Sequence, residues 1–154
     1  MSGSDDLRAL KNLSLFAGLP DSALEELYRT ARIEKRDEGE FFFFQGDPAN
    51  AIYVLSSGRV KLLQLTADGQ QVILRMAVPW TPFGLVGSVP NATYPVTAEA
   101  VENCRALRWG QDALQKMMER YPRITQNAMQ AMAFHVREFQ DRFREMATER
   151  VERR

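Results

Sequence analysis

Residues 51–70 read AIYVLSSGRVKLLQLTADGQ, and this stretch decides the fold. It contains two short β-prone runs, 51–55 and 59–66, separated by Ser56-Ser57-Gly58. The second run alternates apolar and polar side chains, as a half-buried strand does. Asp68-Gly69 follows it and supplies the positive φ angles of a tight hairpin turn. The stretch therefore predicts antiparallel strands joined by glycine turns.

Short β-prone runs separated by turns continue on both sides of this stretch. Further β-prone runs are Phe41–Phe44, Gln71–Val78, Pro95–Glu102 and Cys104–Trp109. Short strands at regular spacing with turn signals predict an antiparallel roll, barrel or sandwich. Because alternate side chains of a strand point to opposite faces, we expect two rings of the Phe41–Phe44 run in the core. The other two should meet solvent, a helix or another chain.

Two short helices are predicted before the strands. The first covers Asp5–Asn12 and the second covers Asp21–Ala31, with Asp21 as the N-cap. In the second helix Leu24, Leu27 and Tyr28 form one apolar stripe at spacings of three and four residues.

After Gly110 the pattern becomes helical to the end of the chain. A short helix is predicted over Asp112–Arg120, and a long one follows Pro122, with no further proline or glycine. Apolar side chains recur in it at alternating spacings of three and four residues: Met129, Met132, Val136, Phe139, Phe143 and Met146. This heptad repeat predicts the seam of a parallel homodimeric coiled coil. The alternative is a helix packed on its own domain, but a helix of ~30 residues is ~45 Å long and outruns a domain of this size.

The predicted organisation is a β-roll sensor domain with N-terminal helices over residues 1–120, followed by a dimerisation helix over residues 121–154. The composition limits the function of this unit. Twenty basic and 20 acidic residues give a net charge of zero, whereas a self-sufficient nucleic-acid binder usually carries a basic excess. We therefore do not expect the chain to bind DNA alone.

Other composition features narrow the function further. A single cysteine, Cys104, excludes an intrachain disulfide and a four-thiolate cluster, and fits a reducing cytoplasm. The sequence has neither an apolar run of ~18 residues, as a membrane span requires, nor a signal peptide. It has no Ser/His/Asp grouping, no metal-ligand spacing and no P-loop, so we expect a protein that is not an enzyme.

Specific turns carry a resemblance to a known family. Gly39-Glu40 with Gln45-Gly46-Asp47, then Ser57-Gly58-Arg59-Val60-Lys61, then Asp68-Gly69, and finally Phe83-Gly84 follow in register. Together with the long helix, they resemble the cyclic-nucleotide-binding fold of CRP/FNR transcription regulators, from about Leu13 to Arg154. The resemblance implies a mainly β protein: a double-stranded β-helix, or jelly roll, with flanking helices and a long C-terminal dimerisation helix.

In that family the chain continues from this helix into a helix-turn-helix domain that reads DNA. The resemblance thus implies an effector-sensing domain that would contact DNA only through a helix-turn-helix domain absent from this chain. The expected ligand pocket comprises Phe83, Gly84, Leu85, Val86, Gly87, Tyr94, Pro95, Val96, Phe139 and Gln140.

The residues at key pocket positions do not favour cAMP. Nucleotide-binding members have a glutamate where this chain has Leu85, and an arginine with a small hydroxyl residue near Tyr94 and Pro95. Burying a phosphate without a cationic partner costs several kcal/mol. Arg75 or Arg105 could supply the charge, although nothing in the sequence places either one at the pocket.

Three alternatives remain open at this stage: a cyclic-nucleotide module with a divergent cassette, a haem-based gas sensor and a ligand-free dimerisation scaffold. Haem ligation would fall to His135, the only histidine, although its place next to Val136 predicts a polar residue at the dimer edge. Cys104 is interpreted as a small core filler. Trp80 is expected either to cover the pocket or to pack on the roll. The effector itself is not identified by the sequence.

Overall fold

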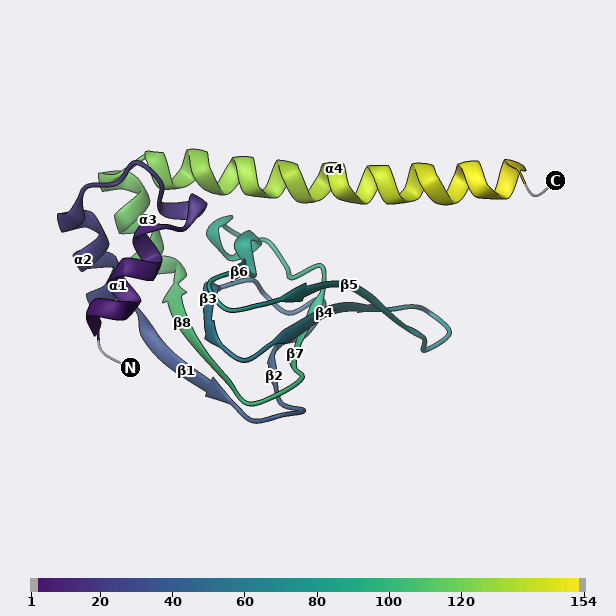
Figure 1. The fold of residues 1–154 in the computed structure, drawn as a ribbon, viewed down its shortest axis with the longest axis horizontal. Helices are drawn as coiled ribbons and strands as arrows, with labels where there is room; N and C mark the ends of the chain where they lie inside the picture. Colours follow the sequence, from purple (N-terminus) through teal and green to yellow (C-terminus); the bar gives the residue numbers. More distant parts are fainter. Residues whose placement is uncertain (1–2, 153–154) are drawn as a thin grey trace.

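A computed structural model describes residues 3–152, without the side chains of residue 139 and of residues 148–152. Two four-stranded antiparallel sheets form the body of the protein (Figure 1). The first sheet has the order β1 (Arg32–Arg36), β8 (Cys104–Gly110), β3 (Ala51–Ser57) and β6 (Pro82–Phe83). The second has the order β2 (Phe41–Phe43), β7 (Thr97–Ala100), β4 (Val60–Leu65) and β5 (Gln71–Ala77). The predicted jelly roll is therefore confirmed.

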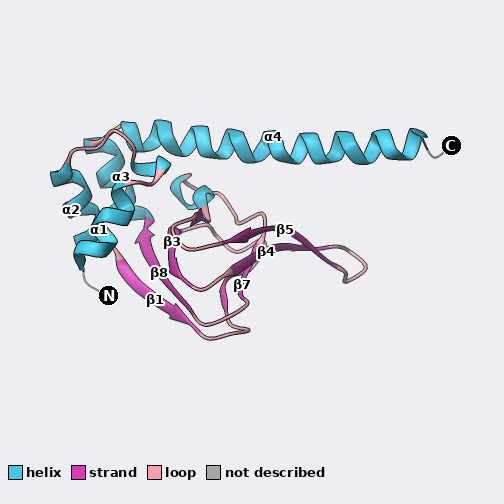
Figure 2. Cartoon of the chain, viewed as in Figure 1, coloured by secondary structure: helices cyan, strands magenta, loops and turns pink. Residues whose placement is uncertain are grey.

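The helices lie at one end of this roll and along one side of it, as Figure 2 shows. The helices α1, α2 and α3 cluster beside the first sheet, and α4 starts at this cluster, runs along one side of the roll and extends beyond it. The bounds are α1 (Gly3–Lys11), η1 (Ser14–Phe16), α2 (Asp21–Thr30), η2 (Leu85–Ser88), α3 (Gln111–Arg120) and α4 (Arg123–Glu152). The expected long C-terminal helix is confirmed.

Two apolar clusters hold these layers together. One joins the helices to the first sheet around Trp109, whose indole Nε1 donates a 2.8 Å hydrogen bond to the carbonyl of Leu27. Phe16 meets the Trp109 ring edge-on, with 5.6 Å between the ring centroids. The other cluster fills the roll with aromatic rings, among them Phe42, Phe83 and Tyr94. Trp80 packs against the first cluster, so it does not cover the pocket.

The phenylalanine run does not alternate as predicted. Phe42 and Phe43 are adjacent, and both are buried, while Phe41 stacks on the exposed Phe44. The cause is a β-bulge: the register to β7 shifts between Phe41 and Phe43. A bulge inserts one residue into a strand and re-aims the side chains beside it. Two rings are thus in the core, but they are neighbours instead of alternate residues.

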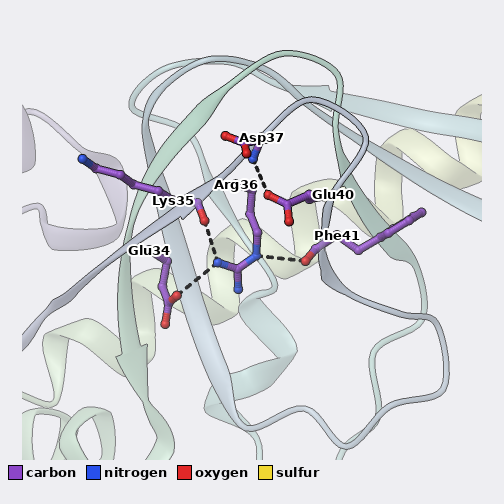
Figure 3. A network of polar contacts seen from close by, with 6 residues as sticks. All are labelled: Glu34, Lys35, Arg36, Asp37, Glu40 and Phe41. Carbon is purple, nitrogen blue, oxygen red and sulfur yellow. Dashed lines mark hydrogen bonds and ion pairs between the residues drawn. The ribbon is translucent and has the colours of Figure 1, made fainter.

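A polar network around Arg36 fixes the turn between β1 and β2 (Figure 3). Its Nε donates to the carbonyl of Phe41 at 3.0 Å, and its Nη1 pairs with the Glu34 carboxylate at 3.2 Å. The guanidinium carbon also lies 5.0 Å from the centroid of the Phe42 ring. The turn closes where the Asp37 amide donates to the Glu40 carboxylate at 2.6 Å. This network holds the bulged strand against the roll.

Local expectations at two other residues have different outcomes. Helix α2 begins at Asp21 itself, so Asp21 is not the N-cap; the Pro20 carbonyl accepts the first helical hydrogen bond, from Ala23, at 3.0 Å. Cys104 opens β8 and is buried, and its thiol donates to the carbonyl of Arg59 at 3.2 Å. Burial raises the pKa of this thiol, as expected of a core filler.

Candidate functional site

The cassette after β6 is seated directly on the first sheet. Gly84 has φ +71°, in the left-handed region that favours glycine, and η2 follows it. Gly87 lies so close to β3 that an added Cβ would stand 2.0 Å from the carbonyl oxygen of Ala51. Glycine at this position therefore lets the short helix approach the strand backbone.

Tyr94 occupies the place near which a nucleotide-binding cassette would carry its arginine. Its hydroxyl donates a 2.6 Å hydrogen bond to the carbonyl of Ala51, and its ring stacks on Phe43 at 3.7 Å between centroids. Burial raises the pKa of Tyr94 to about 12, so the side chain stays neutral. It fills and braces the pocket, but it cannot neutralise a phosphate.

A cavity of about 450 Å³ lies between the cassette, the second sheet and α4. Most of the predicted pocket residues line it: Phe83, Gly84, Leu85, Val86, Tyr94, Pro95, Val96 and Gln140. Gly87 does not line it, because this residue packs on β3. The side chain of Phe139, also predicted at the pocket, lies outside the described residues. The volume falls in the range of small-molecule sites.

The structure adds a polar end to the cavity that the sequence did not indicate. Arg75 from β5 lines it, and its Nη1 donates to His135 Nε2 at 2.8 Å. Arg142 also lines it and donates from Nη1 to the carbonyl of Leu74 at 2.8 Å. By contrast, Arg105 pairs with the buried Asp6 at 3.0 Å and does not line the cavity. Of the two arginines considered from the sequence, Arg75 therefore reaches the pocket and Arg105 does not.

His135 lies on the cavity wall of α4, beside the seam residue Val136, which lines the cavity as well. Its predicted place at the dimer edge stays a prediction. A spacing signal existed for this face: His135, Glu138 and Arg142 stand three and four residues apart, which places them on one side of a helix. The position of His135 next to the apolar seam residue Val136 favours the dimer edge instead. The partner Arg75 is 60 residues away in sequence and carries no such signal.

The electrostatics of this end favour a neutral imidazole. Burial lowers the pKa of His135, and the nearby Arg75 guanidinium lowers it further, against an opposing effect of Glu138. Since arginine only donates, Nε2 must accept, and the imidazole proton is assigned to Nδ1. The carboxylate of Glu138 lies 3.8 Å from Nδ1, beyond hydrogen-bond distance. Burial also lowers the pKa of Arg75.

This arrangement does not fit a haem ligand. The Nε2 lone pair of His135 already accepts from Arg75, so an iron atom would have to displace a guanidinium. Among the side chains that the structure describes, no group of three or more His, Cys, Asp or Glu residues could hold a metal ion. The haem alternative therefore gains no support from the donor set.

We expect the His135 titration to report this contact directly. Because the chain has one histidine, its imidazole protons can be followed by NMR without assignment. Their pKa should fall below the ordinary 6.5, and Arg75→Gln should raise it by removing a positive neighbour. The unfolded chain then binds more protons, so the free energy of unfolding should decrease as the pH falls below 6.5. An unchanged pKa in Arg75→Gln would contradict the contact.

The predicted seam residues form an uncovered apolar stripe along α4. Exposed fractions are 62% for Met129, 57% for Val136, 72% for Phe143 and 59% for Met146. Met132 is half-buried because it also lines the cavity. The Phe139 side chain, the remaining seam position, is not described. Among the described residues, no helix is long and apolar enough to cross a membrane.

Comparison with known proteins agrees with this architecture. The cyclic nucleotide-binding domain family matches residues 33–121. The transcriptional activator protein Anr of Pseudomonas aeruginosa is 30% identical over 118 residues, which cover 77% of this chain and 47% of that protein. The chain thus spans about half the length of the curated relatives it matches.

Two solved structures share the fold closely. The sensor domain of the transcriptional regulator DNR from P. aeruginosa has a TM-score of 0.76 and 26% identity, with 90% of this chain and 93% of that domain covered. The Thermus thermophilus catabolite activator protein has a TM-score of 0.80 and 24% identity. The match covers 87% of this chain and 63% of that protein. The chain therefore belongs to the cyclic nucleotide-binding domain family and is a sensor domain of the CRP/FNR type.

Proposed function

We propose that this chain is the effector-sensing and dimerisation part of a CRP/FNR-type transcription regulator, that it acts in the cytoplasm, that it does not respond to cAMP and that it is not an enzyme. The observation that carries the proposal is the cavity between the cassette and α4. A ligand there would touch the roll and the long helix together. It could therefore favour one arrangement of the two over another, as effector coupling requires.

The attachment of α4 to the rest of the domain would let its later turns move while its first turns stay fixed. Its first turns are fixed: Ile124 and Ala128 are buried, and the Asn127 side-chain amide donates to the carbonyls of Leu15 and Ala17 at 2.9 and 3.0 Å. Farther along, His135 and Arg142 hold the helix to β5 through single polar contacts. A ligand at the cavity would act on this second, weaker attachment.

The apolar stripe supports the dimer part of the proposal. Exposed side chains at heptad spacing would be covered by the same stripe of a second α4 in a parallel pair. Effector binding would then move two helices at once. In the whole regulator, a helix-turn-helix domain outside this chain would read DNA as a dimer on a two-fold site.

The alternatives are weakened by the same cavity. A ligand-free scaffold predicts a pocket filled by its own side chains, whereas about 450 Å³ is open here. A cyclic-nucleotide module with a divergent cassette needs a ribose acceptor and a phosphate cation beside the cassette helix, where Leu85 and Tyr94 stand.

Calorimetry with cAMP tests the proposal. We expect no binding below about 1 mM, a level worth only ~4 kcal/mol. The reason is that a phosphate placed at the cassette would lie against an apolar side chain and a neutral phenol. Circular dichroism on the same sample should establish that the protein is folded. A micromolar dissociation constant would instead establish a nucleotide-binding module with a rearranged cassette.

A further inference from the structure

The cavity combines apolar walls with one cationic end. Leu62, Pro82, Leu85, Val96 and Val136 are among its apolar lining residues. The charged groups that line it are Arg75, Arg142 and Glu138, two cations and one anion. With a neutral imidazole, the charged lining therefore has a net charge of +1 (2 − 1 = +1).

Arg75 is a half-buried cation without an ion-pair partner among the described residues. Its hydrogen bond goes to a neutral imidazole, and no carboxylate comes within 4 Å of it in that part of the chain. A desolvated guanidinium is normally paired, because removing a charge from water is costly unless an opposite charge replaces the solvent. The Glu138 carboxylate partly compensates this charge from a longer distance, but the guanidinium has no direct anionic partner in the described part of the chain.

His135 presents a second unmet requirement at the same place. Its Nδ1 is buried and has no hydrogen-bond partner among the described atoms. With Nε2 accepting from Arg75, Nδ1 carries a proton and needs an acceptor. A buried donor left unpaired destabilises the folded state. The Glu138 carboxylate, 3.8 Å away, is too far to accept this proton. The guanidinium of Arg75 therefore lies at one end of the apolar cavity, beside an imidazole whose own N–H is not satisfied.

We propose that the occupant is a small apolar carboxylate, whose hydrocarbon or aromatic body fills the cavity and whose carboxylate pairs with Arg75. The inference rests on the proposed sensor function and names the class of effector. A carboxylate matches the planar guanidinium in a bidentate pair, and its single charge balances the charged lining. A phosphate monoester, as a dianion, would exceed that charge in apolar surroundings. A cyclic phosphodiester carries one negative charge, so the cAMP titration distinguishes it from a carboxylate.

The pairing also connects the ligand to α4. Arg75 now donates to His135, and a carboxylate would compete for that guanidinium or accept from the imidazole as well. Either way, the contact between β5 and the helix changes when the anion arrives. The single histidine then serves as a spectroscopic reporter of occupancy at this end of the cavity.

The test compares matched anionic and neutral probes by calorimetry: 3-phenylpropionate against 3-phenylpropionamide, and octanoate against octanamide. We expect each carboxylate to bind at least about tenfold more tightly than its amide, the size of one charge-assisted hydrogen bond. Arg75→Gln should reduce that ratio to near one. Arg59→Gln, at an exposed surface pair with Glu102, is the matched control and should leave the ratio unchanged.

NMR of His135 gives a second readout that does not depend on a variant. The carboxylates should shift the imidazole resonances and raise the pKa of His135, because they neutralise the adjacent guanidinium; the amides should not raise it. Equal binding of carboxylates and amides, or no binding of either, would overturn the inference. If the amides bind as tightly as the carboxylates and shift the His135 resonances, the proposed sensor function stands, but the carboxylate is not the effector class. Displacement of either probe by micromolar cAMP would overturn the proposed function instead.

Discussion

The parent protein is expected to be a dimer in light scattering, and a Phe143→Glu variant is expected to behave as a 17.6 kDa monomer at the same concentration. Among the described side chains of the α4 stripe, Phe143 is the most exposed, at 72%. In a two-fold pair, glutamate at this position would bring two carboxylates together in an apolar seam. Burying unpaired charges costs several kcal/mol, and ~4 kcal/mol raises the dimer dissociation constant about a thousandfold.

The chain offers a matched control on the same helix. Phe134 is also exposed, at 57%, but it stands outside the repeat of three and four residues. Phe134→Glu makes the same chemical change and should leave the dimer intact. A Phe143→Glu variant that remains a dimer would contradict the coiled-coil seam. Dissociation by Phe134→Glu alone would place the interface on another face of α4.

The strands and helices of this protein were predictable because their signals are local. Glycine turns such as Gly58 and Gly69 have φ values of +90° and +84°, which few other residues adopt at low cost. The strands that were not singled out as separate elements have weaker signals. β1 (Arg32–Arg36) is mostly charged, and β6 (Pro82–Phe83) has only two residues. Both exist because neighbouring strands pair with them.

The bulge at Phe42 and Phe43 shows a different limit. A period-two pattern assumes one residue opposite one residue, and nothing in four consecutive phenylalanines marks where an extra residue enters. The burial of Phe42 depends on Tyr53 and Phe83, whose rings pack against it at 5.4 and 5.2 Å between centroids. These partners come from other strands.

The candidate site also has a part that the sequence predicts and a part that it does not. The cassette residues from Phe83 to Val96 are close in sequence, so the resemblance located them together, and the structure places most of them around one cavity. The polar end required Arg75 to meet His135 across 60 residues, which depends on how β5 and α4 are packed. Sequence reasoning named both residues, but it had no means of bringing them together.

Gly87→Ala is expected to lower the free energy of unfolding by about 4 kcal/mol or more, an effect reached by few single substitutions. The added methyl would stand 2.0 Å from the carbonyl oxygen and 2.4 Å from the carbonyl carbon of Ala51. Both atoms belong to the backbone of β3, in the middle of the first sheet, so a side-chain rotation cannot relieve the clash. The cassette helix η2 or the strand itself must move, and the cavity wall moves with it.

The matched control is Gly46→Ala, in which the new methyl meets nothing within 4 Å. Its cost comes from the φ of +89° alone, and we expect about 1–2 kcal/mol. Urea denaturation followed by tryptophan fluorescence, at one protein concentration because dimers gain stability with concentration, measures both variants. At a slope of ~2 kcal/mol per molar, Gly87→Ala should lower the midpoint by about 2 M. If it costs no more than Gly46→Ala, then η2 can leave β3 freely. The cassette would then be a movable wall of the pocket, contrary to the fixed one that the contact with Ala51 implies.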